Sequence, residues 1–348
     1  VRLTSIALSH RALFLILGLA LLAVSARQMP LIGRDLMPPM DTGIIKINFE
    51  ADSNTSLEQT ERVMSRMEEI IFSRPEVNSV SSLIGSEPAV ISFGAGRLPQ
   101  QGNITVHLTD RFQRSASIWD IEKDLHTRFQ EIPGLRSVDV FDFGATPLST
   151  IRASVDVMVS GPDLKTLDAI GKDVEARLRA HLRGATSVTR SWTMDSEEIT
   201  FIADPEKLAL YQVSPTSVLG QVAGAVRGMP SSTFRVPNQD GLAIWVQLPR
   251  EQRQDVTELE TYPVSTPVGR IPLVQLGRFE HRPVASVITR QGLQRTLDIQ
   301  AYRSRQPISH LQEDVETALT GLNLPSGYRI SHEGEIKQMN ESFARLGK

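Results

Sequence analysis

The stretch GIIKINFE at residues 43–50 alternates apolar and polar side chains, which places Ile45, Ile47 and Phe49 on one face. A period of two residues is typical of a strand that buries one side and exposes the other. We therefore predict a half-buried strand here, and the pattern on either side of it decides how the fold continues.

Beyond this strand the apolar spacing lengthens to three or four residues, which indicates a helix with one buried face. Thr55 or Ser56 supplies an N-cap, and Glu58 or Gln59 stands in the capping-box position. Pro75 ends the helix, and residues 77–84 return as a strand. The apolar face of the helix consists of Leu57, Met64, Met67 and Ile71.

The same pattern then repeats and completes a β-α-β-β-α-β unit, the ferredoxin-like arrangement. The further elements expected in this first copy are a strand at 103–108, a helix at 117–131 and a strand at 137–143. A second copy opens with a strand at 153–160, a helix that starts at Pro162 and a strand at 185–192. Its other half is predicted only about a hundred residues later, at 294–302, 307–319 and 327–331.

The second copy is therefore interrupted by an insert, with a strand at 199–203, a helix at 215–226 and a hairpin around Asn238–Gly241. The predicted fold is α+β, with two ferredoxin-like βαββαβ domains, the second of them interrupted. The expected boundaries are 1–34 for an apolar helix and its flanks, 35–150 for the first domain, 151–196 with 283–335 for the second, 197–282 for the insert and 336–348 for the start of a further helix.

The run ALFLILGLALLAVSA, Ala12–Ala26, lies between Arg11 and Arg27 and has no polar face. A helix that spans a bilayer needs about 20 apolar residues, so this run is short. A signal peptide explains it equally well, because a charged start precedes it and the small residues Val24-Ser25-Ala26 end it. On both readings the chain beyond Arg27 is exported.

Composition excludes several classes of function. The net charge is −3, from 37 basic and 40 acidic residues, and no Lys or Arg run occurs, so no nucleic-acid partner is expected. The absence of cysteine excludes disulfides and thiolate ligands. The histidines show no metal-binding spacing, so we predict no metal site, no cofactor, no catalytic residue and no enzymatic activity.

The methionines allow two interpretations. Met64 and Met67 fall on the apolar face of a predicted helix, and Met37 and Met40 flank a Pro-Pro pair. Thioethers favour soft metals such as Cu(I), so a metal relay is conceivable. Core filling explains the helical pair more simply, and we favour it.

The long irregular stretch SEPAVISFGAGRLPQQG, residues 86–102, is the strongest binding candidate. Long loops inside compact domains are often functional, and an aromatic beside glycines offers an adaptable apolar contact. A plain hairpin connection explains the same stretch about as well. The residues we assign to a substrate path are Phe93, Arg97, Leu98 and Gln101.

Several motifs resemble the resistance-nodulation-division (RND) efflux transporters of the acriflavine-resistance type. Together they cover residues 40–340 in order, on a matching duplication of ferredoxin-like units. The motifs are LMPPMDTG at 36–43, GRIPL at 269–273, Thr289-Arg290 with LQRT at 293–296, LPSGY at 324–328 and Gly334-Glu335.

The resemblance implies that Ala12–Ala26 is a membrane helix, that the two ferredoxin-like units are porter subdomains, and that 197–282 is a docking subdomain. It implies an inner-membrane protein whose bulk lies in the periplasm, a homotrimer, and partners in a periplasmic adaptor protein and an outer-membrane channel. The implied cargo is small amphiphilic molecules, driven by protons through carboxylates in later membrane helices.

Two other functions stay open. A heavy-metal pump of the same family is one, although Leu98 to Gln101 stand where the copper and silver branch of the family places methionines. The other is an exported or membrane-tethered binding or assembly scaffold, because ferredoxin-like domains serve many functions.

Overall fold

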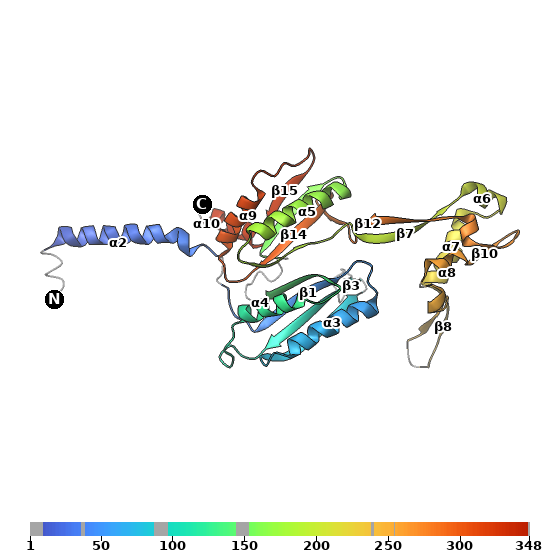
Figure 1. The fold of residues 1–348 in the computed structure, drawn as a ribbon, viewed down its shortest axis with the longest axis horizontal. Helices are drawn as coiled ribbons and strands as arrows, with labels where there is room; N and C mark the ends of the chain where they lie inside the picture. Colours follow the sequence, from blue (N-terminus) through green and yellow to red (C-terminus); the bar gives the residue numbers. More distant parts are fainter. Residues whose placement is uncertain are drawn as a thin grey trace. The chain divides into compact units, whose positions relative to one another are not determined.

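The computed structural model describes residues 10–35, 39–86, 97–143, 153–237, 240–253 and 255–346 (Figure 1). Its contacts divide the chain into two compact units. One unit combines Val1–Ser196 with Ala285–Lys348, and the other is Glu197–Val284.

Helix α2, Arg11–Ile32, is long and apolar enough over Arg11–Gln28 to cross a membrane, by length and composition. Its 22 residues rise about 33 Å, which exceeds the roughly 30 Å hydrocarbon core of a bilayer. The predicted end at Ala26 is therefore too early, because a single charge at Arg27 does not stop a helix. None of the spanning window is buried in protein.

The first domain is a two-layer α/β sandwich, called the first sandwich below. Its sheet has the order β2-β3-β1-β4 with antiparallel neighbours, and helices α3 and α4 cover one face (Figure 1). This order confirms the predicted ferredoxin-like unit. The elements are β1 (Ile44–Ala51), α3 (Leu57–Phe72), β2 (Val77–Ser86), β3 (Arg97–Leu108), α4 (Ile118–Phe129) and β4 (Leu135–Asp142).

Both helices of the first sandwich begin at the serines that the sequence offers. The Ser56 hydroxyl accepts a hydrogen bond from the Gln59 amide, and Ser117 forms a capping box with Asp120. The inward faces meet in an apolar core that includes Met67 and Phe129, both 0% exposed.

Strand β3 begins at Arg97, whereas the predicted strand begins at Asn103, so the loop prediction for residues 97–102 is wrong. Gly102 explains the difference. A Cβ at this position would lie 2.4 Å from the Phe49 ring, so glycine lets the strand continue across a large core side chain.

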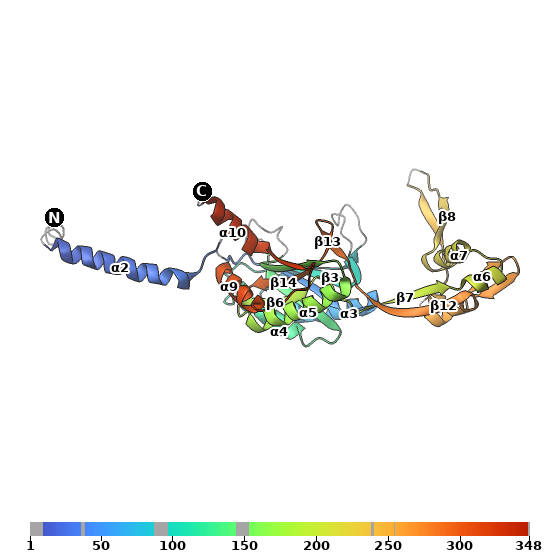
Figure 2. The same ribbon diagram turned by 90° about the horizontal axis from the view of Figure 1, so that it is seen from above.

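The second sandwich repeats this topology. Its sheet places β6 beside β14, β14 beside β5 and β5 beside β15, and helices α5 and α9 pack together over the sheet (Figure 2). A short strand β13 (Thr289–Gln291) forms a hairpin with β14, and α10 (Gly334–Leu346) follows the sheet. The elements are β5 (Val155–Gly161), α5 (Leu164–His181), β6 (Ala185–Arg190), β14 (Gln294–Arg303), α9 (Ile308–Leu319) and β15 (Arg329–Glu333).

Two details of the second sandwich differ from the sequence pattern. Helix α5 begins after the N-cap Asp163, so Pro162 lies just outside it. Trp192 follows β6 rather than ending it, and its ring is 0% exposed. The indole Nε1 donates to the Thr296 carbonyl at 2.8 Å, which satisfies the one polar atom of this side chain.

The insert forms the second compact unit, with a small core of its own. The predicted hairpin is confirmed, because β8 and β9 pair antiparallel; Asn238 in its turn lies outside the described residues. The elements are β7 (Ser196–Ala203), α6 (Pro205–Leu210), α7 (Pro215–Arg227), β8 (Met229–Phe234), β9 (Leu242–Val246), η1 (Arg250–Gln252), α8 (Val256–Glu260), β10 (Pro263–Thr266), β11 (Gly269–Pro272), η2 (Leu273–Leu276) and β12 (Gly277–Val284).

Met64 and Met67 confirm the core filling predicted for the helical pair. Met67 is fully buried, and Met64 packs against the same core from the edge of α3. Met40 is 41% exposed, and Met37 lies outside the described residues.

Candidate functional site

The two sandwiches meet along a seam formed by their edge strands β4 and β6. The seam is polar. The Ser187 hydroxyl donates to Asp139 at 2.6 Å and the Thr189 hydroxyl at 3.0 Å, while the Thr186 hydroxyl lies 3.2 Å from the carbonyl oxygens of Val140 and Tyr302. Hydrogen bonds therefore connect two bodies whose apolar cores are separate.

Asp139 is the charged group at the centre of the seam. Burial raises the pKa of its carboxyl to about 6, although the hydrogen bonds from Ser187 and Thr189 act in the opposite direction. The carboxyl therefore changes charge close to physiological pH, at the contact between the two sandwiches.

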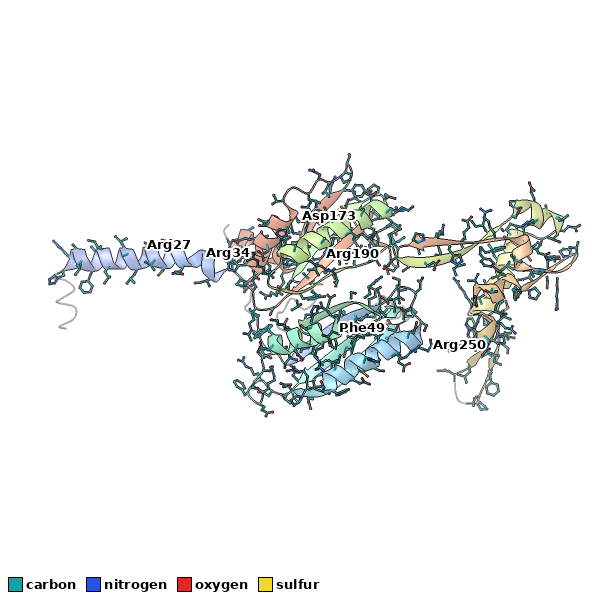
Figure 3. The ribbon with its side chains drawn as sticks, in the orientation of Figure 1. Arg27, Arg34, Phe49, Asp173, Arg190 and Arg250 are labelled. Atoms are coloured by element: carbon teal, nitrogen blue, oxygen red, sulfur yellow. The ribbon has the colours of Figure 1, made fainter. Side chains whose placement is uncertain are left out.

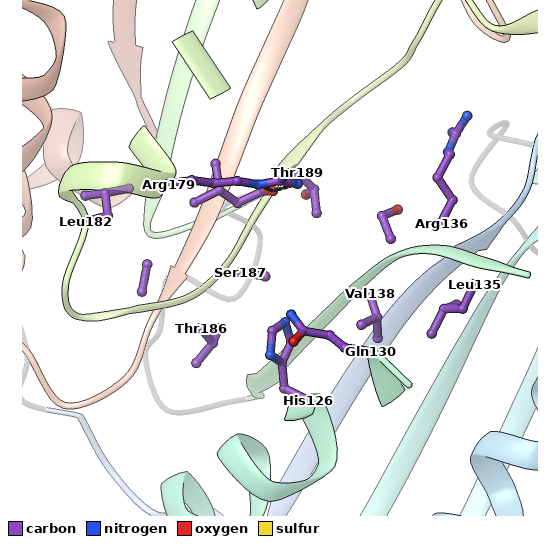
Figure 4. Close-up of a pocket in the computed structure, with 13 residues that line it drawn as sticks. His126, Gln130, Leu135, Arg136, Val138, Arg179, Leu182, Thr186, Ser187 and Thr189 are labelled. Atoms are coloured by element: carbon purple, nitrogen blue, oxygen red, sulfur yellow. Dashed lines mark hydrogen bonds between the residues drawn. The ribbon is translucent and has the colours of Figure 1, made fainter. Parts of the chain in front are cut away.

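A cavity of about 470 Å³, called the helix-side cavity, lies on the helical side of the seam (Figure 4). The first sandwich contributes His126 of α4, Gln130 at the end of that helix and residues of β4, and the second contributes Arg179 and Leu182 with residues of β6. Burial lowers the pKa of His126, so this imidazole is neutral at pH 7.

A smaller cavity of about 200 Å³, the sheet-side cavity, is lined almost entirely by strand residues of the two sandwiches. Phe49 and Arg190, labelled in Figure 3, reach it from the two sandwiches. The first sandwich provides Asn48, Phe49, Glu50, Arg97, Gln101, Ser137 and Asp139, and the second provides Thr189, Arg190, Ser191, Gln300 and Tyr302.

Tyr302 is the aromatic wall of the sheet-side cavity. Its ring stacks on Phe141 across the seam, with centroids 4.0 Å apart and planes 8° apart. Burial raises the pKa of its phenol above the usual range, so the hydroxyl stays protonated and forms a hydrogen bond with Asn48. The wall is therefore uncharged and stacked on a second ring.

Arg136 ties the first sandwich to the segment that leads into the insert. Its guanidinium pairs with Glu50 on β1 and with Asp195 at 2.9 Å, and it donates to the Ser53 and Thr193 hydroxyls at 2.7 and 2.8 Å. The positive charge of Arg136 is thus fully compensated by neighbours from both sandwiches.

A second arginine joins the segment after α2 to the second sandwich. Arg303 pairs with Asp35 at 2.5 Å and with Glu335 at 3.1 Å. Near Arg303, burial raises the pKa of Asp142 to about 6.

Glu122 on α4 is 0% exposed, and neither of its carboxyl oxygens has a partner among the described residues. Burial raises the pKa of Glu122 well above its usual value.

The predicted substrate-path residues do not stay together. Arg97 and Gln101 line the sheet-side cavity. Leu98 lies on the same strand, where its amide donates to the Gln101 side chain at 3.3 Å, but it does not line the cavity. Phe93 lies outside the described residues.

Sequence reasoning missed most of the lining. Asn48, Asp139 and Tyr302 come from three strands that are far apart in the sequence. Each stands at a polar position on the open face of a half-buried strand, so the alternation used to predict the strands also marked these residues. Nothing in the pattern indicated that the two open faces share a cavity.

No group of three or more His, Asp or Glu side chains is arranged to hold a metal ion within the part of the chain that the structure describes. The charged residues around the sheet-side cavity include the cations Arg97 and Arg190 as well as carboxylates. Cations beside the carboxylates oppose the binding of a bare metal ion.

Known proteins resemble the whole chain. The model of the AcrB/AcrD/AcrF family matches residues 1–347. The cation efflux system protein CzcA of Alcaligenes sp. is 24% identical over 369 residues, which is 99% of this chain and 32% of the relative. The nickel and cobalt resistance protein CnrA of Cupriavidus metallidurans is 22% identical over 354 residues, which is 94% of this chain and 31% of the relative.

The fold also occurs in a solved structure. The crystal structure of a heavy metal efflux pump, crystal form I, superposes with a TM-score of 0.82 at 16% identity, over 95% of this chain and 35% of that chain. The chain thus spans about a third of the length of the relatives and of the structure that it matches.

Proposed function

Because the chain belongs to the AcrB/AcrD/AcrF family, the acriflavine-resistance type of RND efflux transporter, we propose that it forms the periplasmic porter part of a proton-driven efflux pump. Helix α2 anchors it in the inner membrane, and the two sandwiches and the insert lie on the periplasmic side. The two sandwiches act as porter subdomains and the insert as a docking subdomain. A homotrimer, a periplasmic adaptor and an outer-membrane channel complete the assembly.

The proposal rests on the seam. Two sandwiches with separate apolar cores meet through hydrogen bonds, and cavities of about 470 and 200 Å³ lie beside that contact. Close-packed cores resist deformation, whereas a polar contact exchanges its partners with water at little net cost. Hinge or shear motion of rigid bodies would therefore open and close the cavities, which is what alternating access requires.

We propose that the cargo is a small amphiphilic organic molecule and that no covalent chemistry takes place. The sheet-side cavity joins an aromatic wall, Tyr302, to neutral amides such as Asn48 and Gln101. Apolar and aromatic surface with a few placed polar groups is typical of sites for organic ligands. Arg97 and Gln101 remain our substrate-path residues, and we add Tyr302 and Asn48.

Cation efflux is the second candidate, because the similar proteins CzcA and CnrA are named for cation efflux and for nickel and cobalt resistance. Cation efflux would require carboxylate or imidazole groups that converge on one metal ion when the two sandwiches move.

A transport assay separates the two candidates. The full-length gene is returned to a host that lacks it, and cells are tested for accumulation of amphiphilic dyes of different charge and for growth on zinc, cobalt and nickel. We expect loss of the gene to raise dye accumulation severalfold. Tyr302→Ala in the full-length protein should raise dye accumulation by most of the same amount. Leu293→Ala is the control, because Leu293 is 97% exposed.

If gene loss changes only metal tolerance, the pump exports cations and our cargo assignment fails. If neither dye accumulation nor metal tolerance changes, the efflux proposal itself fails.

A further inference from the structure

Arg97 lines the sheet-side cavity, and no described acidic side chain is paired with it. Arg97 makes no ion pair or hydrogen bond with any residue that the structure describes. Burial lowers the pKa of the guanidinium from its usual value, yet an arginine stays charged at neutral pH. Removing a charge from water without a counterion is unfavourable. Arg97 therefore brings to the cavity a positive charge that no described side chain pairs with directly.

The other charged side chains around this cavity are satisfied by the protein. Glu50 pairs with Arg136, and Arg190 pairs with two carboxylates on α5 at 2.6 and 2.7 Å. Asp139 accepts hydroxyl hydrogen bonds across the seam. Among the described lining residues, Arg97 is the cation without a bound partner, whereas the carboxylate of Asp139 is held by two hydroxyls.

The size and the remaining walls of the cavity restrict what that ligand is. Sites for drug-sized ligands occupy roughly 300–1,000 Å³, whereas this cavity measures about 200 Å³. It suits one end group of a molecule, bound beside the ring of Tyr302 and the amides of Asn48, Gln101 and Gln300. A guanidinium forms paired hydrogen bonds with carboxylate, phosphate or sulfonate groups.

We propose that the sheet-side cavity selects amphiphilic organic anions, and that Arg97 binds their anionic end group while the adjoining apolar part lies against Tyr302. This assignment rests on the proposed efflux function and names the class of its cargo. Divalent cations are disfavoured here by the same charge that attracts the anion.

Binding to a matched pair of probes tests the assignment. The purified full-length protein is titrated with 8-anilino-1-naphthalenesulfonate and with N-phenyl-1-naphthylamine, which differ in the sulfonate group, and fluorescence gives the two dissociation constants. Arg97→Gln removes the charge at similar size, and Arg97→Lys keeps the charge without the planar fork. Arg66→Gln is the matched control, because Arg66 is exposed on α3.

We expect Arg97→Gln to weaken binding of the sulfonate probe 10- to 100-fold, the usual range for a charge-assisted hydrogen bond, and to change binding of the neutral probe less than twofold. Arg97→Lys should recover part of the loss, and Arg66→Gln should bind both probes like the unchanged protein. Equal weakening of both probes, or no weakening of either, overturns the assignment.

The same variants in cells separate this failure from failure of the efflux proposal. If cells with the unchanged gene export the dyes and Arg97→Gln exports anionic and neutral dyes equally well, efflux stands and anion selection falls. If the unchanged gene exports no dye, the amphiphile cargo falls whatever the binding result, and the efflux proposal falls as well if metal tolerance is also unchanged.

Discussion

The interiors of the two sandwiches and the seam between them are built from opposite chemistry. Each interior is a separate cluster of buried apolar side chains, with Phe129 in the first and Trp192 in the second. The seam consists of hydroxyls, a carboxylate and backbone carbonyls, together with the stacked rings of Phe141 and Tyr302. Apolar burial fixes the shape of each body, whereas the polar contact sets only a preference for one arrangement. The difference indicates which parts of the chain stay rigid and which part rearranges.

The largest effect should come from the interior. Phe129→Ala removes a 0% exposed ring and leaves a cavity, so the free energy of unfolding should fall by about 3–5 kcal/mol. Phe112→Ala is the control, since its ring is 88% exposed. Denaturant unfolding measures both variants. A small loss at Phe129 would mean that the interior is looser than its burial indicates.

A smaller effect should come from the charge at the seam. The carboxyl of Asp139 has a pKa of about 6 in the folded protein and an ordinary value of 3.8. The folded state therefore binds this proton more tightly than the unfolded chain does. The resulting penalty is complete above pH 6 and disappears as the pH falls toward 4.

Asp139→Asn keeps an acceptor for Ser187 and Thr189 and removes the charge. We expect it to stabilise the fold at pH 8 by about 2 kcal/mol or less, and not at pH 4. Unfolding free energies of both proteins at several pH values measure this difference. A gain that is equal at pH 4 and pH 8 would show that the charge of Asp139 is not its source.

The smallest effect should come from a neutral hydrogen bond of the seam. Thr186→Val keeps the shape and removes the hydroxyl that contacts the carbonyl oxygens of Val140 and Tyr302. We expect a loss of about 0.5–1 kcal/mol and faster hydrogen exchange at β4 and β6, with exchange in β1 unchanged. Thr127→Val on exposed α4 surface is the control. A loss as large as that of Phe129→Ala would remove the distinction between seam and interior.

The sequence predicted the sandwiches well because each element carries its own local signal. Ser56 and Ser117 mark helix starts, and the alternation through Ile45 and Ile47 marks a strand whichever partner it finds. The seam carries no such signal. In the sequence, nothing distinguishes Asp139, Thr189 and Tyr302 from ordinary solvent-facing residues. Contact between two domains produces no periodic pattern of apolar residues in a single sequence.

The start of β3 was missed for a different reason. From the local sequence, Gly102 and Pro99 predict a loop. In the folded protein Gly102 is part of a strand, because its lack of a side chain lets the strand pass over the Phe49 ring. Arg97 was named for its place in a loop, and its placement in the sheet-side cavity depends on that strand. The local pattern therefore identified Arg97 as a candidate residue but did not predict which residues surround it.

The insertion has a consequence for the order in which the chain folds. Strands β6 and β14 are neighbours in the second sheet, yet the whole unit Glu197–Val284 separates them along the chain. On the ribosome, the first sandwich is complete once β4 has emerged. The second cannot form its sheet until the insert and β14 have been made, because β14 pairs with both β5 and β6, and strands without partners expose edges that favour wrong pairing. Because the insert has a core of its own, its folding during this period would remove its apolar side chains from wrong contacts with β5 and β6.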